Sequence, residues 1–101
     1  MTSVFGYMKD LIPYKTCLKE RSNPPLQIVA NEESDIYYLN ESSAYFYELC
    51  DNKKTIEDIL QLFLETYDVE RQVAESDLVE LIRDLQWKQV LRLREKKNES
   101  V

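Results

Sequence analysis

The stretch Asp35–Asp51, DIYYLNESSAYFYELCD, contains the change of hydrophobic period that decides the fold. Up to Leu39 it is rich in aromatic and β-branched residues, which is typical of a short strand. After Asn40 the apolar positions recur at about 3.5-residue intervals, as in a helix. Asn40 is a good N-cap because its side-chain oxygen accepts an amide proton of the first turn. We therefore expect a strand followed by a helix that ends near Asp51.

Two further strands are predicted before this stretch, over Thr16–Arg21 and Leu26–Ala30. The sequence Asn23-Pro24-Pro25 separates them, because proline lacks an amide donor and biases the preceding residue away from helix. The polar residues 31–34 supply a turn before the strand Asp35–Leu39, and the short spacing favours an antiparallel hairpin. A small three-stranded antiparallel sheet is thus expected in the first 40 residues.

Two amphipathic helices follow. Thr55 and Asp58 resemble a capping box, with Asp in place of the usual Glu or Gln, at the start of a helix with one apolar face that extends to about Tyr67. A last helix is predicted from about Glu70 to Trp87. The expected fold class is α+β, with a three-stranded antiparallel sheet followed by three helices.

Composition limits the function. The chain has 101 residues and a net charge of −6, with 44% apolar and 32% charged residues, which suits one folded domain. It contains no His, the commonest general base and metal ligand. The acidic balance argues against nucleic acid as a partner, since phosphate binding needs clustered Lys and Arg. With one glycine, Gly6, no glycine-rich phosphate loop is expected.

Cys17 and Cys50 lie far apart and outside any C-x-x-C pair, so we expect reduced thiols and no zinc site or other metal. Residues 1–14 contain no apolar run of signal-peptide or membrane length. The sequence therefore predicts a cytoplasmic protein with no membrane partner. No catalytic residue and no cofactor are expected, because no catalytic pair stands out among the charged helix-surface residues.

Three regions are predicted: an N-terminal extension over 1–14, a domain over 15–91 and a disordered basic tail over 92–101. Three roles stay open for the extension, namely packing on the domain, contact with a partner enzyme, and exchange between two copies. The last would give a homodimer by strand exchange.

Two surfaces are candidates for binding. Successive strand side chains point to opposite faces, so Tyr37 and Tyr38 do not both enter one core, and one of them is free for a partner. Simple strand propensity explains the two tyrosines equally well. On the last helix, Val79, Arg83 and Gln86 lie beside the core stripe, on a face that is suited to line a groove.

In combination and order, several short motifs resemble the PqqD family, the pyrroloquinoline-quinone biosynthesis protein D family, over roughly Lys15–Leu91. They are Tyr38-Leu39-Asn40-Glu41, Ala44, Leu49-Cys50-Asp51, Thr55-Ile56, Ile59 and Tyr67-Asp68-Val69.

The resemblance implies a winged helix-turn-helix-like fold and a role as a recognition element for ribosomally synthesised peptides. Such a domain binds the leader of a precursor peptide and presents the peptide to a modifying enzyme, often a radical S-adenosylmethionine (SAM) enzyme, and catalyses nothing itself. The leader is implied to pair with the edge of the third strand and to lie against the exposed side of Asp77–Gln86. The implied peptide-binding residues are Asp35, Ile36, Tyr37, Tyr38, Leu39, Val79, Ile82, Arg83 and Gln86.

We expect apolar leader side chains, rather than a purely acidic motif, to make this contact, because the strand edge is acidic and Arg83 is its only nearby base. The sequence departs from the family at Asn52 and Gln89, where Gly is usual; Asn adopts a left-handed cap readily and Gln does so poorly. Two alternatives are a winged-helix DNA-binding regulator, disfavoured by the acidic last helix, and an accessory subunit that contributes to the active site of a maturase.

Overall fold

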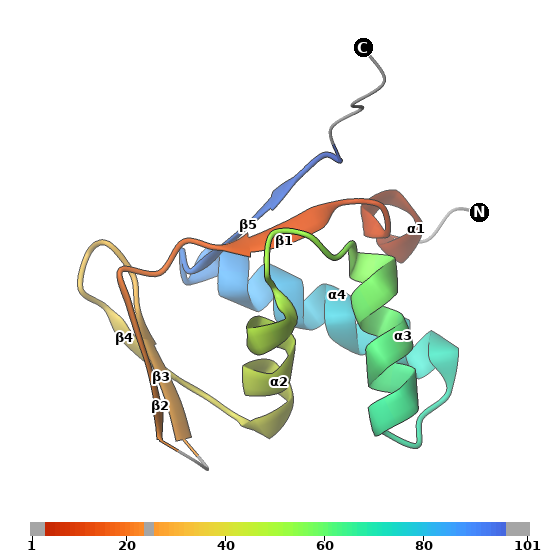
Figure 1. Cartoon of the computed structure of the whole chain (residues 1–101), viewed down its shortest axis with the longest axis horizontal. Helices are drawn as coiled ribbons and strands as arrows, with labels where there is room; N and C mark the ends of the chain where they lie inside the picture. The colour runs from red at the N-terminus through yellow and green to blue at the C-terminus, as the bar shows by residue number, and fades with distance from the viewer. Residues whose placement is uncertain (1–3, 24–25, 97–101) are drawn as a thin grey trace.

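The computed structural model describes residues 4–23 and 26–96 (Figure 1). Within these residues the chain forms helices and strands in the order α1 (Val4–Met8), β1 (Ile12–Lys15), β2 (Lys19–Asn23), β3 (Leu26–Ala30), β4 (Ile36–Leu39), α2 (Glu41–Leu49), α3 (Ile56–Thr66), α4 (Arg71–Trp87) and β5 (Leu91–Arg94).

The larger sheet among the described residues is antiparallel and has the strand order β2-β3-β4. Its register pairs Val29 of β3 with Glu20 of β2 and with Tyr37 of β4. This confirms the predicted α+β class with a three-stranded antiparallel sheet. In Figure 1 the sheet stands at one end of the molecule, with α2 beside it and α4 running behind α2 and α3.

The order of elements differs from the prediction at both ends. Helix α1 and strand β1 precede the sheet, and β5 follows the last helix and pairs antiparallel with β1. Pro13 interrupts the apolar pattern that would have predicted β1. Strand β1 pairs with β5 on one side and makes only a single bridge, from Tyr14 to Asp51, on the other, so it tolerates a residue without an amide donor. Ile12 and Leu91 are almost completely buried, which anchors the ribbon to the core.

Both expected terminal regions contribute to this arrangement. From residues 1–14, the predicted extension, Phe5 of α1 belongs to the main hydrophobic cluster. From the predicted tail, Arg92–Arg94 lie in β5. The remainder of that tail, from residue 97 onward, lies outside the described residues, as do residues 1–3 of the extension.

The predicted helix starts are confirmed. The Asn40 side chain accepts the Ser43 amide at 2.9 Å and caps α2. At the start of α3, Thr55 Oγ1 accepts the Asp58 amide at 3.2 Å, and the Asp58 carboxylate accepts the Thr55 amide at 3.0 Å. Helix α4 begins after Glu70, which caps it without a side-chain hydrogen bond.

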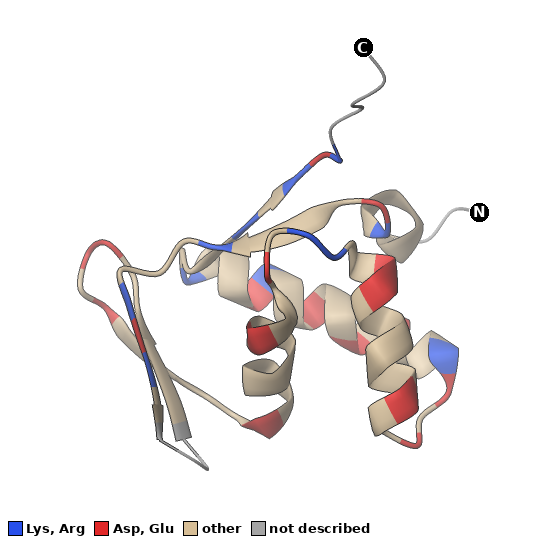
Figure 2. Ribbon diagram, in the orientation of Figure 1, with Lys and Arg blue, Asp and Glu red and all other residues tan. Residues whose placement is uncertain are grey.

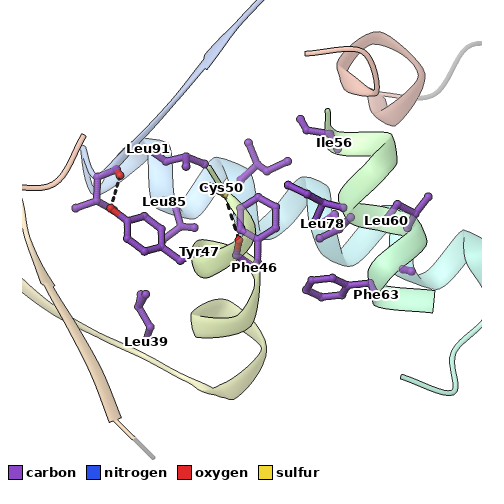
Figure 3. Packing of buried hydrophobic residues seen from close by; sticks show 14 of the residues in the cluster. Leu39, Phe46, Tyr47, Cys50, Ile56, Leu60, Phe63, Leu78, Leu85 and Leu91 are labelled. Carbon is purple, nitrogen blue, oxygen red and sulfur yellow. Dashed lines mark hydrogen bonds between the residues drawn. The ribbon is translucent and has the colours of Figure 1, made fainter. Parts of the chain in front are cut away.

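The core lies between α2, α3 and α4 and continues to β5 (Figure 3). Phe46 and Tyr47 of α2 are both fully buried. The Tyr47 hydroxyl donates a hydrogen bond of 2.9 Å to the Val90 carbonyl, just before β5. Burial raises the pKa of this hydroxyl far above its usual value, so it stays protonated and keeps its donor role. Helix α2 is thereby tied to the last strand.

Gln89 ends α4 in a left-handed conformation, with φ 62°. The Val90 amide donates to the Leu85 carbonyl at 3.1 Å, and the Gln89 amide donates to the Gln86 carbonyl at 3.0 Å. These two bonds form a Schellman motif, in which Gly is the usual left-handed residue. The helix therefore ends as it does in proteins that have Gly here, although Gln has a Cβ that this conformation crowds.

We expect Gln89→Gly to stabilise the protein. Relief of left-handed strain contributes about 1 kcal/mol, and the greater freedom of Gly in the unfolded chain cancels about half of it. The free energy of unfolding in urea should rise by several tenths of a kcal/mol. The matched control Gln86→Gly, inside the helix, should lose about 1 kcal/mol. Equal destabilisation by both changes would contradict the assignment of strain to Gln89.

Candidate functional site

Strand β4 has a free edge in the part of the chain that the structure describes, since it pairs with β3 alone. The Asn31 amide donates to the Asp35 carbonyl at 3.0 Å, which makes this a hydrogen-bonded pair of the antiparallel ladder. Because such pairs alternate along a ladder, Tyr37 also directs its backbone groups to β3. The amide and carbonyl groups of Ile36 and Tyr38 therefore face the free edge.

The side chains of β4 alternate between two faces, as predicted for Tyr37 and Tyr38. Leu39 is buried in the core and Tyr37 is half-buried against it. Ile36 is 62% exposed and Tyr38 is 66% exposed on the opposite face. The strand thus presents two exposed apolar side chains at the same residues whose backbone groups face outward.

A groove of about 460 Å³ begins at the end of β4. Asn40, which follows the strand, lines it together with the first turn of α2, the last turns of α3 and one side of α4. Phe63, Tyr67 and Leu81 supply apolar surface to the groove. The groove therefore begins at the residue that follows β4.

Aromatic packing fixes one wall of the groove. The ring of Tyr45 lies 5.1 Å from that of Phe63 and 5.9 Å from that of Tyr67, between ring centroids, and the latter two rings are 5.4 Å apart. The Tyr45 hydroxyl also makes a 2.9 Å hydrogen bond with Thr66 Oγ1. Tilted and edge-on contacts of this kind favour one arrangement of the rings. The apolar wall is thus set before any ligand binds.

The position of β4 relative to α4 depends on Asn31, which is 2% exposed. Its Oδ1 accepts the amides of Glu33 and Asp35 at 2.9 and 3.0 Å, which closes the turn before β4. Its Nδ2 donates to the Lys88 carbonyl at the end of α4, at 3.0 Å, and to the Asp35 carboxylate at 3.3 Å. One buried amide therefore joins the turn to the helix terminus.

A second contact joins the same two elements through Lys88. Its ammonium lies 5.3 Å from the centroid of the Tyr37 ring and 2.7 Å from the Asp84 carboxylate. Half-buried Tyr37 is thus covered by a residue of α4. The two contacts hold the free edge of β4 at a fixed distance from the helix.

The expected peptide-binding residues fall into separate places. Asp35 lies directly before β4, and Ile36–Leu39 form the strand, as predicted. On α4, Ile82 is completely buried in the core. Val79 and Arg83 line another pocket, beside Val4 and Phe5 of α1.

Gln86 lines a third pocket, together with Tyr14 of β1 and Glu32 of the turn before β4. The structure therefore places Val79 and Arg83 in one pocket, Gln86 in another and Ile82 in the core. Their role in peptide binding stays a prediction that the fold alone does not test.

The side of α4 that faces the groove carries Ala74, Asp77, Leu81 and Asp84. Leu81 is half-buried, unlike the fully buried Leu78 and Ile82 of the same helix. The contributions of α2 and α3 to the groove are not predicted from the sequence. The spacing 74, 77, 81, 84 is itself a helical stripe, but the sequence gives no sign that this stripe, rather than its neighbour, is left uncovered.

Other reactive groups lie in ordinary structural positions. Cys17 and Cys50 are free thiols, as expected. Burial raises the pKa of the Cys50 thiol to about 12, so it stays protonated and donates to the Phe46 carbonyl. Among the described residues no group of three or more Cys, Asp or Glu side chains is placed to hold a metal ion. Nor does any described helix have the length and apolarity needed to cross a membrane.

Comparison with known proteins identifies the family. The family model described as "Coenzyme PQQ synthesis protein D (PqqD)" matches residues 27–91, from β3 to the start of β5. This segment is well over half of the chain, and the chain therefore belongs to the PqqD family. It contains β4, the groove and all of α4. A search of curated proteins found no match.

A solved structure shares the fold. It is described as "TbiB1 in Complex with the TbiA(beta) Leader Peptide", and it superposes with a TM-score of 0.69 at 20% sequence identity. The match covers 73% of this chain and 87% of that one. At this identity the likeness establishes a common fold.

We expect Asn31→Ala to destabilise the protein by roughly 2–4 kcal/mol, because it removes a buried amide that hydrogen-bonds to backbone groups at both ends of the junction. The free energy of unfolding in urea measures this loss. Glu33→Ala is the matched control, since Glu33 takes part through its backbone amide alone and its side chain is exposed. Its effect should stay within about 0.5 kcal/mol. Similar values for the two variants would show that the Asn31 side chain carries no special role.

Proposed function

We propose that this protein binds the leader segment of a ribosomally synthesised precursor peptide by β-addition at the free edge of β4. The main observation behind this proposal is the unpaired edge of β4, where the backbone groups of Ile36 and Tyr38 face outward beside the groove. Membership of the PqqD family supports the proposal, as does the shared fold with TbiB1, whose structure holds a leader peptide.

The physical basis is the unpaired backbone of an edge strand. An extended peptide satisfies these groups by hydrogen bonding, which gives affinity without sequence preference. Side chains that alternate along the peptide then enter neighbouring pockets, which gives selectivity. In this protein the groove that starts at Asn40 is a pocket next to the end of β4.

We assign the protein no catalytic step. The sequence has no His, and the buried Cys50 thiol stays protonated. In the proposed role the chain presents the peptide to a separate modifying enzyme, and the family resemblance makes a radical SAM enzyme the expected partner. Cytoplasmic location and homodimer formation by strand exchange are kept as predictions of the sequence.

The order of the sheet and the helices α2 to α4 resembles that of a winged helix-turn-helix domain, and we propose this description for that part of the fold.

A DNA-binding role fits the structure less well. The helices carry many carboxylates (Figure 2), and Asp77, Glu80 and Asp84 lie on the exposed side of α4. This charge repels a phosphate backbone.

The test uses a probe chosen by display. Random peptides are selected on the immobilised protein, and a recovered peptide is synthesised with a fluorescein label for anisotropy measurements. We expect Tyr38→Pro to weaken binding roughly tenfold, because it removes an outward amide donor. Proline is tolerated where an edge amide faces solvent, so the free energy of unfolding should change by less than about 1 kcal/mol.

Tyr38→Thr is the matched control, since it removes the aromatic ring and retains the amide. It should bind the probe more tightly than Tyr38→Pro does. Ile36→Pro repeats the test at the other outward-facing position. Equal binding by the Pro and Thr variants would contradict β-addition, and failure to select any peptide on the wild-type protein would contradict the proposed function.

A further inference from the structure

The groove beside β4 carries an unbalanced negative charge. Asp77, Glu80 and Asp84 line it from α4, and no Lys or Arg is among its lining residues. Lys88, at the end of α4, pairs with Asp84 at 2.7 Å. Asp77 and Glu80 have no ion pair among the residues that the structure describes. Both side chains are exposed to solvent.

The charge of a further carboxylate reaches the groove lining. Burial, and after it the charge of Glu41 of α2, raises the pKa of the Tyr67 hydroxyl. Tyr67 itself lines the groove. Negative charge from α2 as well as from α4 therefore acts on the groove lining. Fields of the same sign add at a cation bound there.

Apolar surface lies in the same groove as the carboxylates of α4. Phe63, Tyr67 and Leu81 form it, and the aromatic contacts described above hold two of these side chains in place. This combination differs from a solvated acidic helix face, which offers no apolar surface. It matches a cation that arrives with an apolar side chain next to it, or with the methylene stem of a Lys or Arg.

The outer side of α4 adds an aromatic ring. Trp87 is 83% exposed, and it follows Asp84 by three positions and Glu80 by seven, so all three lie along one side of the helix. An exposed indole with carboxylates one and two turns away suits a guanidinium, which stacks on the ring while it pairs with an oxygen.

We propose that the groove selects leader segments in which a Lys or Arg stands next to an apolar residue. This inference rests on the proposed leader-binding function and names the chemistry of the peptide. The occupant is the stretch of leader that leaves the β4 edge at Asn40, where edge and groove meet. The charge of the groove sets the requirement for a base, and Phe63, Tyr67 and Leu81 set the requirement for an apolar neighbour.

Display of random peptides tests the proposal. The wild-type protein should enrich peptides with Lys or Arg beside an apolar residue, relative to the starting library. The double variant Asp77→Asn/Glu80→Gln should lose the preference for a base and keep the preference for extended, apolar peptides. A basic probe selected on wild type should bind the double variant between about three- and tenfold more weakly, and the difference should shrink at high salt.

The matched control is Asp10→Asn/Glu48→Gln, which changes the charge by the same amount at two exposed positions outside the groove lining. It should bind the basic probe as wild type does. If both double variants bind the basic probe equally weakly, net charge alone explains the effect and the proposal is overturned. It is also overturned if the peptides selected on the wild-type protein are not enriched in Lys or Arg.

The test separates this inference from the function on which it rests. If peptides are selected and Tyr38→Pro weakens their binding, but no base is enriched, leader binding stands and the proposed selectivity is wrong. If no peptide is selected at all, both proposals fail.

Discussion

The buried side chain of Asn31 holds together the two elements on which the candidate site depends. It accepts hydrogen bonds from backbone amides of Glu33 and Asp35, and it donates one to the backbone carbonyl of Lys88, the residue that caps the end of α4. A buried amide is stabilising when all of its hydrogen-bonding groups are satisfied, as here, and costly otherwise. The edge of β4 and the groove therefore keep one relative position. A peptide that uses both binds a preformed surface and loses less entropy to ordering of the protein.

Local chemistry made much of the fold predictable. Asn40 and the Thr55–Asp58 pair are short-range signals, and each caps a helix as expected. The β1–β5 ribbon has no such signal, because Ile12 pairs with Arg94 at the other end of the chain. Pro13 also hides the strand pattern. Long-range pairing of short strands depends on the finished core, which the sequence pattern does not describe.

The candidate site was predictable for β4 and less so for α4. Alternation along a strand correctly separates Tyr37 from Tyr38. On α4 two polar stripes flank the core stripe, and the one with Val79 and Arg83 lies beside α1. The sequence does not predict α1, so it gives no sign of the helix beside that face, and the groove lies on the side of Leu81. A short helix without a clear sequence signal thus adds a neighbour to one of the two stripes.

The β1–β5 ribbon also has a consequence for how the chain matures on the ribosome. Ile12 is made early, but its partner strand is among the last described residues to be synthesised. Until that strand leaves the exit tunnel, β1 has no strand to pair with, and apolar surface near the amino end stays accessible to chaperones. Contacts of such long sequence separation form slowly. Completion of the domain therefore waits until β5 has left the ribosome.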